Sequence, residues 1–210
     1  MVNIVLIGKQ GSGKGTQAKL LAKQFDLEHI NTGALFRKHI EEQTHLGIIA
    51  DEYIKKGELV PDKFVFQLIE ESIEPDIKGL VFDGFPRTLE QAAYLVERYR
   101  IDKVIYLSLP IEVAKKRITS RVECKNCGKT YNLLTSPPLM EGVCDVCGSV
   151  VGSRADDKPE AIEKRISEFL EKTKILIDFF SKRDIAITVD ASASVEEVFS
   201  ELCEIVKELF

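Results

Sequence analysis

The stretch VNIVLIGKQGSGKGT, residues 2–16, decides the fold of this chain. Its first six residues form a short apolar run rich in Val and Ile, which is typical of a buried parallel strand. A glycine-rich loop, Gly8–Thr16, follows and opens a helical pattern over residues 14–25. In this context the glycines let backbone N–H groups converge on phosphate oxygens, and the helix N-terminus adds partial positive charge. The stretch therefore predicts a phosphate-binding loop on an α/β sheet.

Lys14 in this loop is expected to reach the β- and γ-phosphates of a nucleotide. The strict pattern has Ser or Thr directly after the lysine, whereas here Gly15 precedes Thr16. The alternative, a glycine-rich turn with an incidental lysine, would not require a strand before the loop and a helix after it.

Outward from the loop, apolar runs alternate with helical patterns. We predict further strands at Leu80–Asp83, Val104–Leu109 and Ile185–Val189, and helices over 88–99, 111–120, 158–182 and 194–209. The pairs Thr88/Gln91, Asp157/Glu160 and Ser194/Glu197 have the spacing of capping boxes. A doubly wound parallel sheet is the expected architecture. Residues 31–60, helical without a strand, and 122–157, rich in Cys, Gly and Pro, are predicted to be insertions at the carboxyl edge of the sheet, where ligands bind.

Composition bounds the class of protein. The chain has 210 residues, 44% hydrophobic and 30% charged, enough for one sizeable core. A net charge of −5 argues against a protein that coats nucleic acid. No apolar run approaches a membrane span, and the N-terminal run lacks the basic segment of a signal peptide. We expect a cytoplasmic protein without a membrane partner, in which paired cysteines indicate metal rather than disulfides.

Two Cys-x-x-Cys pairs, made by Cys124, Cys127, Cys144 and Cys147, have the spacing of a tetrahedral zinc site. Four thiolates leave no open position for water, so the predicted zinc is structural rather than catalytic. Residues 128–143 contain one Lys, one Glu and no Arg, which is a poor electrostatic surface for a nucleic-acid-binding zinc ribbon.

The stretch VFDGFPRTLEQA, residues 81–92, contains a second group of polar residues. Asp83 ends a predicted strand, as does the carboxylate that holds magnesium and its waters opposite a phosphate loop. Thr88 is explained most simply as a helix cap. For Gln91 two interpretations stay open: a helix cap, or an amide that reads the edge of an adenine.

The phosphate loop, NTGALFR (31–37), GELVPD (57–62), DGFPRT (83–88), RITSR (117–121), RADD (154–157) and Arg165 together resemble the bacterial-type adenylate kinases that have a long, metal-bearing lid. The resemblance covers nearly the whole chain. It implies a P-loop nucleoside monophosphate kinase fold with two mobile lobes, and phosphoryl transfer from MgATP to AMP that gives two ADP. It further implies a monomer with Mg²⁺ bound with ATP and structural Zn²⁺ in the lid.

The resemblance also divides the chain and assigns roles. Residues 1–30, 61–121 and 158–210 match the core, 31–60 the AMP-binding lobe and 122–157 the zinc-binding lid. The ATP site matches Gly11, Ser12, Gly13, Lys14, Gly15, Thr16, Arg117 and Arg121. The AMP site matches Thr32, Gly33, Arg37, Gly57, Leu59, Val60, Gly84, Arg87, Gln91, Arg154 and Arg165. The catalytic cations match Lys14, Arg87, Arg121, Arg154 and Arg165. Asp83 matches the magnesium-associated position, and Asp156 and Asp157 match positions linked to lid closure.

Arginine usage supports these assignments. The chain has 20 Lys but only 9 Arg, and six of the nine fall at these positions: 37, 87, 117, 121, 154 and 165. A guanidinium is planar, always charged and able to bind phosphate with two hydrogen bonds.

Three departures from the family pattern stand out. Ala34 replaces the usual Asp, Gln10 a frequent Pro, and Gly152–Ser153 bulkier residues before Arg154. None of the three removes a phosphate ligand.

Rival functions are a UMP or CMP kinase, a GTPase and a zinc-ribbon nucleic-acid module. The long lid and Gln91 favour adenine over the pyrimidine kinases. The chain has no Asn-Lys-x-Asp guanine motif, and the near-neutral stretch between the two cysteine pairs disfavours nucleic acid.

Overall fold

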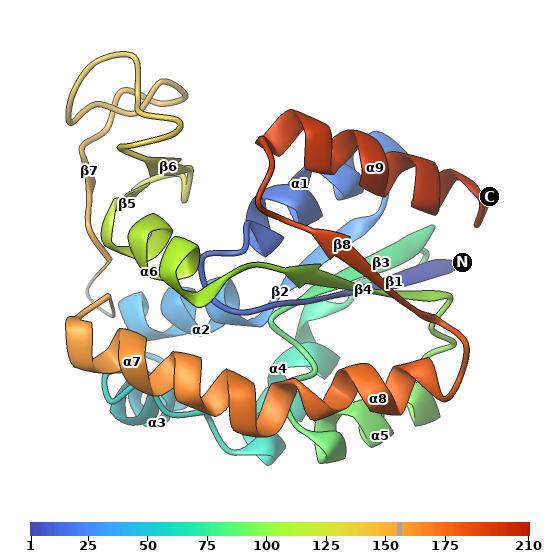
Figure 1. Ribbon diagram of the computed structural model, residues 1–210. Coiled ribbons are helices and arrows are strands. Elements are labelled where there is room, and N and C mark those ends of the chain that lie inside the picture. Colours follow the sequence, from blue (N-terminus) through green and yellow to red (C-terminus); the bar gives the residue numbers. More distant parts are fainter. Residues whose placement is uncertain (155–156) are drawn as a thin grey trace.

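The computed structural model describes residues 1–154 and 157–210. Five parallel strands form the central sheet in the order β2-β3-β1-β4-β8 (Figure 1). They are β1 (Val2–Ile7), β2 (Glu28–Asn31), β3 (Gly79–Asp83), β4 (Lys103–Ser108) and β8 (Ala186–Asp190). The predicted parallel sheet is confirmed, with one strand more than predicted. The edge strand β2 was missed because only Ile30 of its four residues is buried, so it has no apolar run.

Helices cover both faces of the sheet, as a doubly wound fold requires. In Figure 1, α1 (Lys14–Phe25) and α9 (Val195–Lys207) lie above it, and α4 (Asp62–Ser72), α5 (Leu89–Arg98) and α8 (Ile175–Ser181) lie below. Alternation along β1 supplies both cores: Ile4 and Leu6 pack on one side, Val5 and Ile7 on the other.

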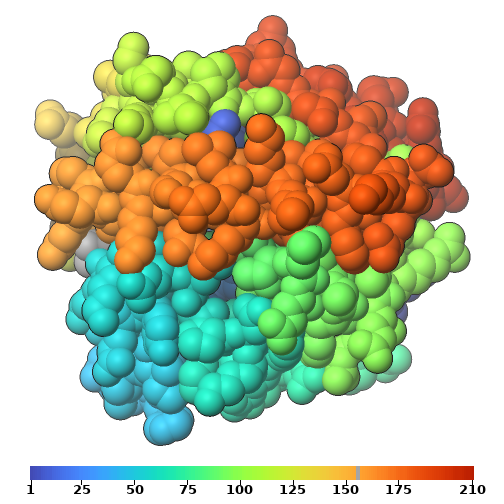
Figure 2. Space-filling view, turned by 60° about the horizontal axis from the view of Figure 1, so that its bottom comes forward, coloured from blue at the N-terminus to red at the C-terminus, as the bar shows by residue number. Residues whose placement is uncertain are grey.

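The segment predicted as one helix over 158–182 is a helix with a π-helical turn. It consists of α7 (Pro159–Glu168), η1 (Phe169–Thr173) and α8, and the Lys174 N–H donates to the Phe169 carbonyl at 2.9 Å. The predicted apolar stripe is buried throughout: Ile162, Ile166, Phe169, Thr173, Leu176 and Phe180. In Figure 2 this segment forms a band across the molecule, between the lid side and the α3–α5 side.

The three predicted capping boxes have different outcomes. Ser194 and Glu197 form a complete box at α9. Thr88 caps α5, but the Gln91 side chain bonds elsewhere. The prediction for Asp157 is wrong: α7 has Lys158 as its N-cap, and the Asp157 carboxylate pairs with arginines instead.

Two smaller units lie at the carboxyl edge of the sheet. The first is the helix pair α2 (Thr32–Glu41) and α3 (His45–Ile54), followed by the turn that leads to α4. The second follows α6 (Ile111–Thr119) and is an antiparallel sheet of order β6-β5-β7, made of β5 (Arg121–Cys124), β6 (Thr130–Asn132) and β7 (Val151–Gly152). Its buried apolar cluster has five members: Val122, Cys124, Tyr131, Cys144 and Val151. Among the described residues, no helix is both long and apolar enough to span a membrane.

Candidate functional site

The phosphate loop joins β1 to α1. Gly11 and Gly13 have φ angles of +83° and +85°, a conformation that glycine adopts without steric cost and that turns successive N–H groups toward one point. The buried Ser12 hydroxyl has no hydrogen-bond partner among the described residues. These features suit a loop that binds an anion through its backbone.

Lys14 folds back over this loop. Its Nζ donates to the carbonyls of Gly8 at 2.6 Å and Lys9 at 3.0 Å. Burial lowers the pKa of Lys14 from 10.5 to about 8; Asp83 opposes this shift, and the positive charges of Arg87 and Arg121 add to it. Lys14, Arg87 and Arg121 therefore share one electrostatic environment.

Asp83 ends β3 beside the phosphate loop, and an added Cβ on Gly15 would lie 3.2 Å from Asp83 Oδ2. Asn31 Nδ2 donates to the same oxygen, and His29 Nε2 lies 3.4 Å from it. Burial raises the pKa of Asp83, but the approach of the His29 imidazole and the Lys14 charge outweigh it, so the net shift is downward. An ionised carboxylate at this place fits a magnesium ion with its waters.

Asn31 and His29 were not among the predicted site residues. Both lie on β2, the strand that had no apolar pattern, and Asn31 is directly opposite Asp83 in the β2–β3 register. Asn31 also accepts the Ala34 N–H at 2.7 Å as the N-cap of α2. The helix start is thereby stabilised without an acidic residue at position 34.

Asp157 connects three parts of the chain. Arg121 donates Nε and Nη2 to its carboxylate at 2.6–2.9 Å, Gln10 donates Nε2 at 3.0 Å, and Arg165 Nη1 lies 3.7 Å away. Its side chain is only 4% exposed. The phosphate loop, the lid and α7 thus meet at one carboxylate. Asp156, predicted beside it, lies outside the described residues.

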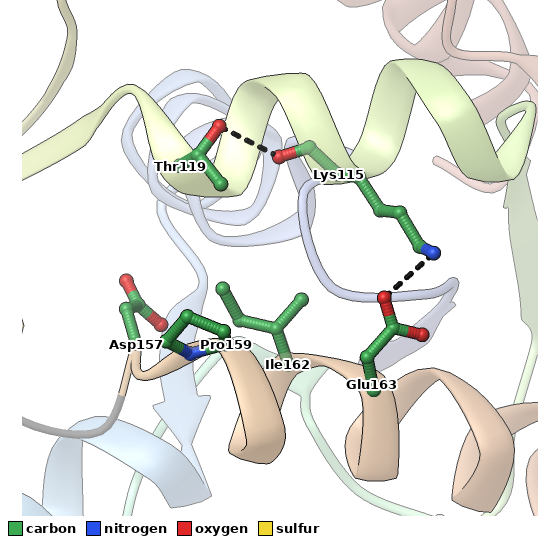
Figure 3. Close-up of a pocket in the computed structure, with 6 residues that line it drawn as sticks. All are labelled: Lys115, Thr119, Asp157, Pro159, Ile162 and Glu163. Atoms are coloured by element: carbon green, nitrogen blue, oxygen red, sulfur yellow. Dashed lines mark hydrogen bonds and ion pairs between the residues drawn. The ribbon is translucent and has the colours of Figure 1, made fainter.

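Asp157 also lines a cavity of about 210 Å³ between α6 and α7 (Figure 3). The other lining residues are Lys115, Thr119, Pro159, Ile162 and Glu163. Lys115 and Glu163 pair at 2.7 Å at the far end from Asp157, so this cavity borders the cationic cluster rather than containing it.

A second carboxylate, Glu123 on β5, joins the lid to α2. It accepts a hydrogen bond from Arg154 Nη2, and Arg37 Nε lies 3.9 Å from its other oxygen. Glu123 was not predicted, because nothing in its local sequence distinguishes it from a solvated charge. Together, Asp157 and Glu123 contact four of the six predicted site arginines.

The remaining predicted residues lie at two places. Arg117 donates to the carbonyls of Ala191, Ser192 and Ala193 in the loop before α9, at 2.8–3.4 Å. The second place is the Gly84 carbonyl directly after β3, which accepts from Arg87 Nε at 2.7 Å and from Thr32 Oγ1 at 2.9 Å.

The other residues predicted for the AMP side lie in turns and next to helices. Gly84 and Gly57 have φ angles of +79° and +72°. An added Cβ on Gly57 would meet Ala161 of α7, and one on Gly33 would meet Arg37 Nη1. Leu59 and Val60 precede the start of α4, with Val60 buried.

The four lid cysteines form one cluster. All four Sγ atoms lie within 4.8 Å of one another, and the Cys124–Cys147 and Cys127–Cys144 pairs are 3.5 Å apart. A tetrahedral zinc with bonds of about 2.3 Å needs sulfurs about 3.8 Å apart, so the cluster fits zinc.

A parallel doubly wound sheet, a phosphate loop at its carboxyl edge, and arginines contributed by α2, the lid, α7 and the loop before α5 define a P-loop phosphotransferase for nucleotides. The family model for adenylate kinase matches residues 6–185. The chain belongs to the adenylate kinase family.

Similar proteins named adenylate kinase span nearly the whole chain. That of Thermoanaerobacter sp. (strain X514) is 43% identical over 209 residues, 96% of each chain. That of Caldanaerobacter subterraneus subsp. tengcongensis is 41% identical over 208 residues, 96% of this chain and 94% of its own. That of Staphylococcus aureus (strain Mu50) is 40% identical over 216 residues, which are 99% of this chain and 100% of its own.

Proposed function

We propose that this chain carries out the adenylate kinase reaction, the reversible transfer of a phosphoryl group from MgATP to AMP, with ATP on the phosphate loop and AMP beside α2 and the start of α5. The observation that supports this division most directly is the arrangement of cations. Lys14 folds back over the phosphate loop, whereas Arg87 and Thr32 donate to the Gly84 carbonyl, and Arg37 lies against Gly33 at the start of α2.

On the ATP side, residues 11–16 bind the phosphates through backbone N–H groups, and Lys14 approaches the β- and γ-phosphates. Arg117, held by the carbonyls of the loop before α9, covers the adenine face. Magnesium bound with ATP neutralises charge on the β- and γ-phosphates. Asp83, ionised and buried, would hold it through its waters.

On the AMP side, Arg37 and Arg87 bind the monophosphate, and Thr32, Gly33 and Gly84 line its pocket. Leu59 and Val60 contact the adenine, Gly57 lets the chain turn against α7, and Gln91 reads the base edge. Arg154 and Arg165 face the transferred group from the lid and from α7.

The transfer needs positioning and charge stabilisation more than covalent assistance. An oxygen of the AMP phosphate attacks the γ-phosphorus, the bond to the β–γ bridging oxygen breaks, and ADP leaves. AMP is already ionised, so no base has to remove a proton. Lys14, Arg87, Arg121, Arg154 and Arg165 stabilise the negative charge on the transferred oxygens.

We further propose that residues 122–157 and 31–60 are mobile lobes on a rigid core formed by 1–30, 61–121 and 158–210. Enclosure of both nucleotides keeps water from the phosphoryl donor. Asp156 and Asp157 act in lid closure, since Asp157 at the end of the lid already pairs with Arg121 and Arg165 of the core. Zinc on the four cysteines is structural, and the protein is a cytoplasmic monomer.

The test compares affinities for the two nucleotides. Arg37→Ala and Arg87→Ala should each weaken AMP binding by roughly ten- to hundredfold, because a charge-assisted contact is lost, with far less effect on ATP. Arg183→Ala, which removes an arginine that bonds the Phe179 carbonyl on the far end of α8, is the matched control. Equal losses for AMP and ATP, or a loss for ATP alone, would mean that the two sites are assigned the wrong way round. Turnover with CMP, UMP and GMP as acceptors, measured in the same assay, tests the preference for adenine.

A further inference from the structure

Gln91 is held in one orientation by partners at both ends of its amide. Its Oε1 accepts the Arg87 backbone N–H at 2.7 Å, and its Nε2 donates to Asp62 Oδ1 at 2.6 Å. The side chain is almost fully buried, at 2% exposed. Because a backbone N–H can only donate and a carboxylate can only accept, the two ends of the amide cannot exchange places.

Asp62 is itself fixed. It is the first residue of α4, and its Oδ2 accepts from Thr88 Oγ1 at 3.1 Å. The same hydroxyl accepts the Gln91 backbone N–H at 3.1 Å as the N-cap of α5, so its own proton is directed to Asp62. Asp62, Thr88 and Gln91 form a closed set of hydrogen bonds between the starts of α4 and α5.

These contacts leave one Nε2 hydrogen and one Oε1 lone pair for a ligand. That pair matches adenine, whose exocyclic amine donates and whose ring nitrogen accepts. A 6-oxopurine presents the reverse order, an acceptor at O6 and a donor at N1. Binding it in the same way would require the Gln91 amide to flip, which would place Oε1 against the Asp62 carboxylate and Nε2 against the Arg87 N–H.

We infer that Asp62 is a positioning residue that locks the Gln91 amide in the orientation that accepts adenine and rejects 6-oxopurines. It acts through Gln91 and does not touch the nucleotide itself. This inference rests on the base-reading role proposed above for Gln91, and it adds the residue that determines which base is read.

The test is the ratio of kcat/KM for AMP to kcat/KM for IMP, which differs from AMP only at position 6 and in its N1 proton. Asp62→Asn keeps the shape but offers either an oxygen or an NH₂ group to Gln91. Because the Arg87 N–H still constrains the amide, we expect the ratio to fall by about five- to tenfold, the lower part of what a bidentate base contact provides. KM for ATP and kcat with AMP should change little. A general packing defect would instead lower kcat/KM for both monophosphates alike and leave their ratio unchanged.

Glu71→Gln is the matched control, because Glu71 accepts from the Gln67 amide at 2.9 Å on the same helix but at an exposed position. Its ratio should equal that of the parent protein, and an equal fall would overturn the role of Asp62. Should Asp62→Asn fail to fold, Thr88→Val removes the hydroxyl that holds Asp62 and should lower the ratio in the same direction.

Gln91→Ala distinguishes the positioning role of Asp62 from the base-reading role of Gln91. If it abolishes the preference for AMP while folded Asp62→Asn keeps the full ratio, the positioning role is wrong and the proposed site stands. If neither variant changes the ratio, Gln91 does not read the base, and that part of the proposed function is wrong as well.

Discussion

Asp157 and Glu123 contact four of the arginines predicted for the site and help to position them. Asp157 accepts hydrogen bonds from two nitrogens of Arg121, and Glu123 accepts one from Arg154. Like charges gathered at one place repel, and a buried cation without an anionic partner is costly. The two carboxylates reduce that cost. They also orient the guanidinium groups, whose paired N–H donors can bind the oxygens of a phosphate in the same way.

Lys14 provides the most direct test of the phosphate loop. Lys14→Met keeps the length of the side chain but removes the charge, so the fold should persist while turnover falls roughly hundredfold or more, as for loss of one transition-state donor. The measurement is steady-state ADP formation, with circular dichroism as the folding control. Near-normal turnover by a folded variant would mean that Lys14 does not contact the transferred group.

The pH response of nucleotide binding follows from the lowered pKa of Lys14, about 8. With a pKa of about 8 this lysine loses its charge progressively as the pH rises through 8, whereas ATP phosphates favour its charged form and raise its pKa. ATP binding at pH 8.5 should therefore take up protons, and ATP affinity should fall as the pH rises through 8 toward 10.

Calorimetry in buffers of different ionisation enthalpy measures this proton uptake directly. Lys14→Arg is the control, because an arginine stays charged at these pH values and its variant should show no comparable uptake. The same uptake in Lys14→Arg would assign the proton to another group.

At the scale of elements, the lid is the unit least able to fold by itself. Its three short strands bury a cluster of five residues, and two of these are the cysteines Cys124 and Cys144. The cluster is too small to offset the loss of conformational entropy of the lid, so we expect a metal on the four cysteines to supply the difference.

Removal of the metal should therefore unfold the lid and leave the sheet core intact. One zinc should bind per chain, and Cys124→Ser with Cys127→Ser should abolish binding. Structural zinc contributes about 10–16 kcal/mol of apparent binding free energy in small domains. Because Arg121 and Arg154 would lose their common support, ATP use and turnover should fall more than AMP binding does.

Metal analysis, amide hydrogen exchange and ADP formation by the zinc-free protein in fresh magnesium measure these effects together. Exchange should become fast in the lid and stay slow in the parallel strands. Complete loss of activity with lid and core both still protected would contradict a purely structural zinc.

At the scale of the whole molecule, polar contacts join the smaller units to the rest of the chain. Arg37 on α2 approaches Glu123 of the lid to 3.9 Å, and Gln10 of the phosphate loop donates to Asp157 at the end of the lid. We expect nucleotides bound at the two proposed sites to add contacts that only the folded chain can make.

ADP, which can occupy both sites, should accordingly raise the unfolding temperature. A ligand at a hundred times its Kd stabilises the folded state by about 2.7 kcal/mol, which for a chain of this size is about 5–10 °C. Scanning calorimetry with and without ADP and magnesium measures the shift. Arg87→Ala should show a clearly smaller shift at the same ADP concentration, and an undiminished shift would contradict its place in the site.

The sequence by itself determined the features that depend on near neighbours in the chain. The strand, glycine loop and helix over residues 2–25 are consecutive, so their hydrophobic pattern and turn chemistry predict both the fold class and the phosphate loop. The cysteine spacing likewise predicts a cluster, because each pair lies within one short turn. The prediction of a buried apolar stripe over residues 162–180 is confirmed. No local pattern in the sequence indicated the π-helical turn within it.

Only the tertiary structure decided which distant residues meet. Gln10 and Asp157 are 147 positions apart, Asn31 and Asp83 are 52 apart, and Asp62 and Gln91 are 29 apart. In each pair a local pattern allowed a simpler role, such as a cap or a solvated charge, because hydrogen-bond partners are set by the packing of elements rather than by sequence separation. The orientation of the Gln91 amide depends on a backbone N–H and a carboxylate from two different helix starts. Their meeting is a property of the folded chain alone.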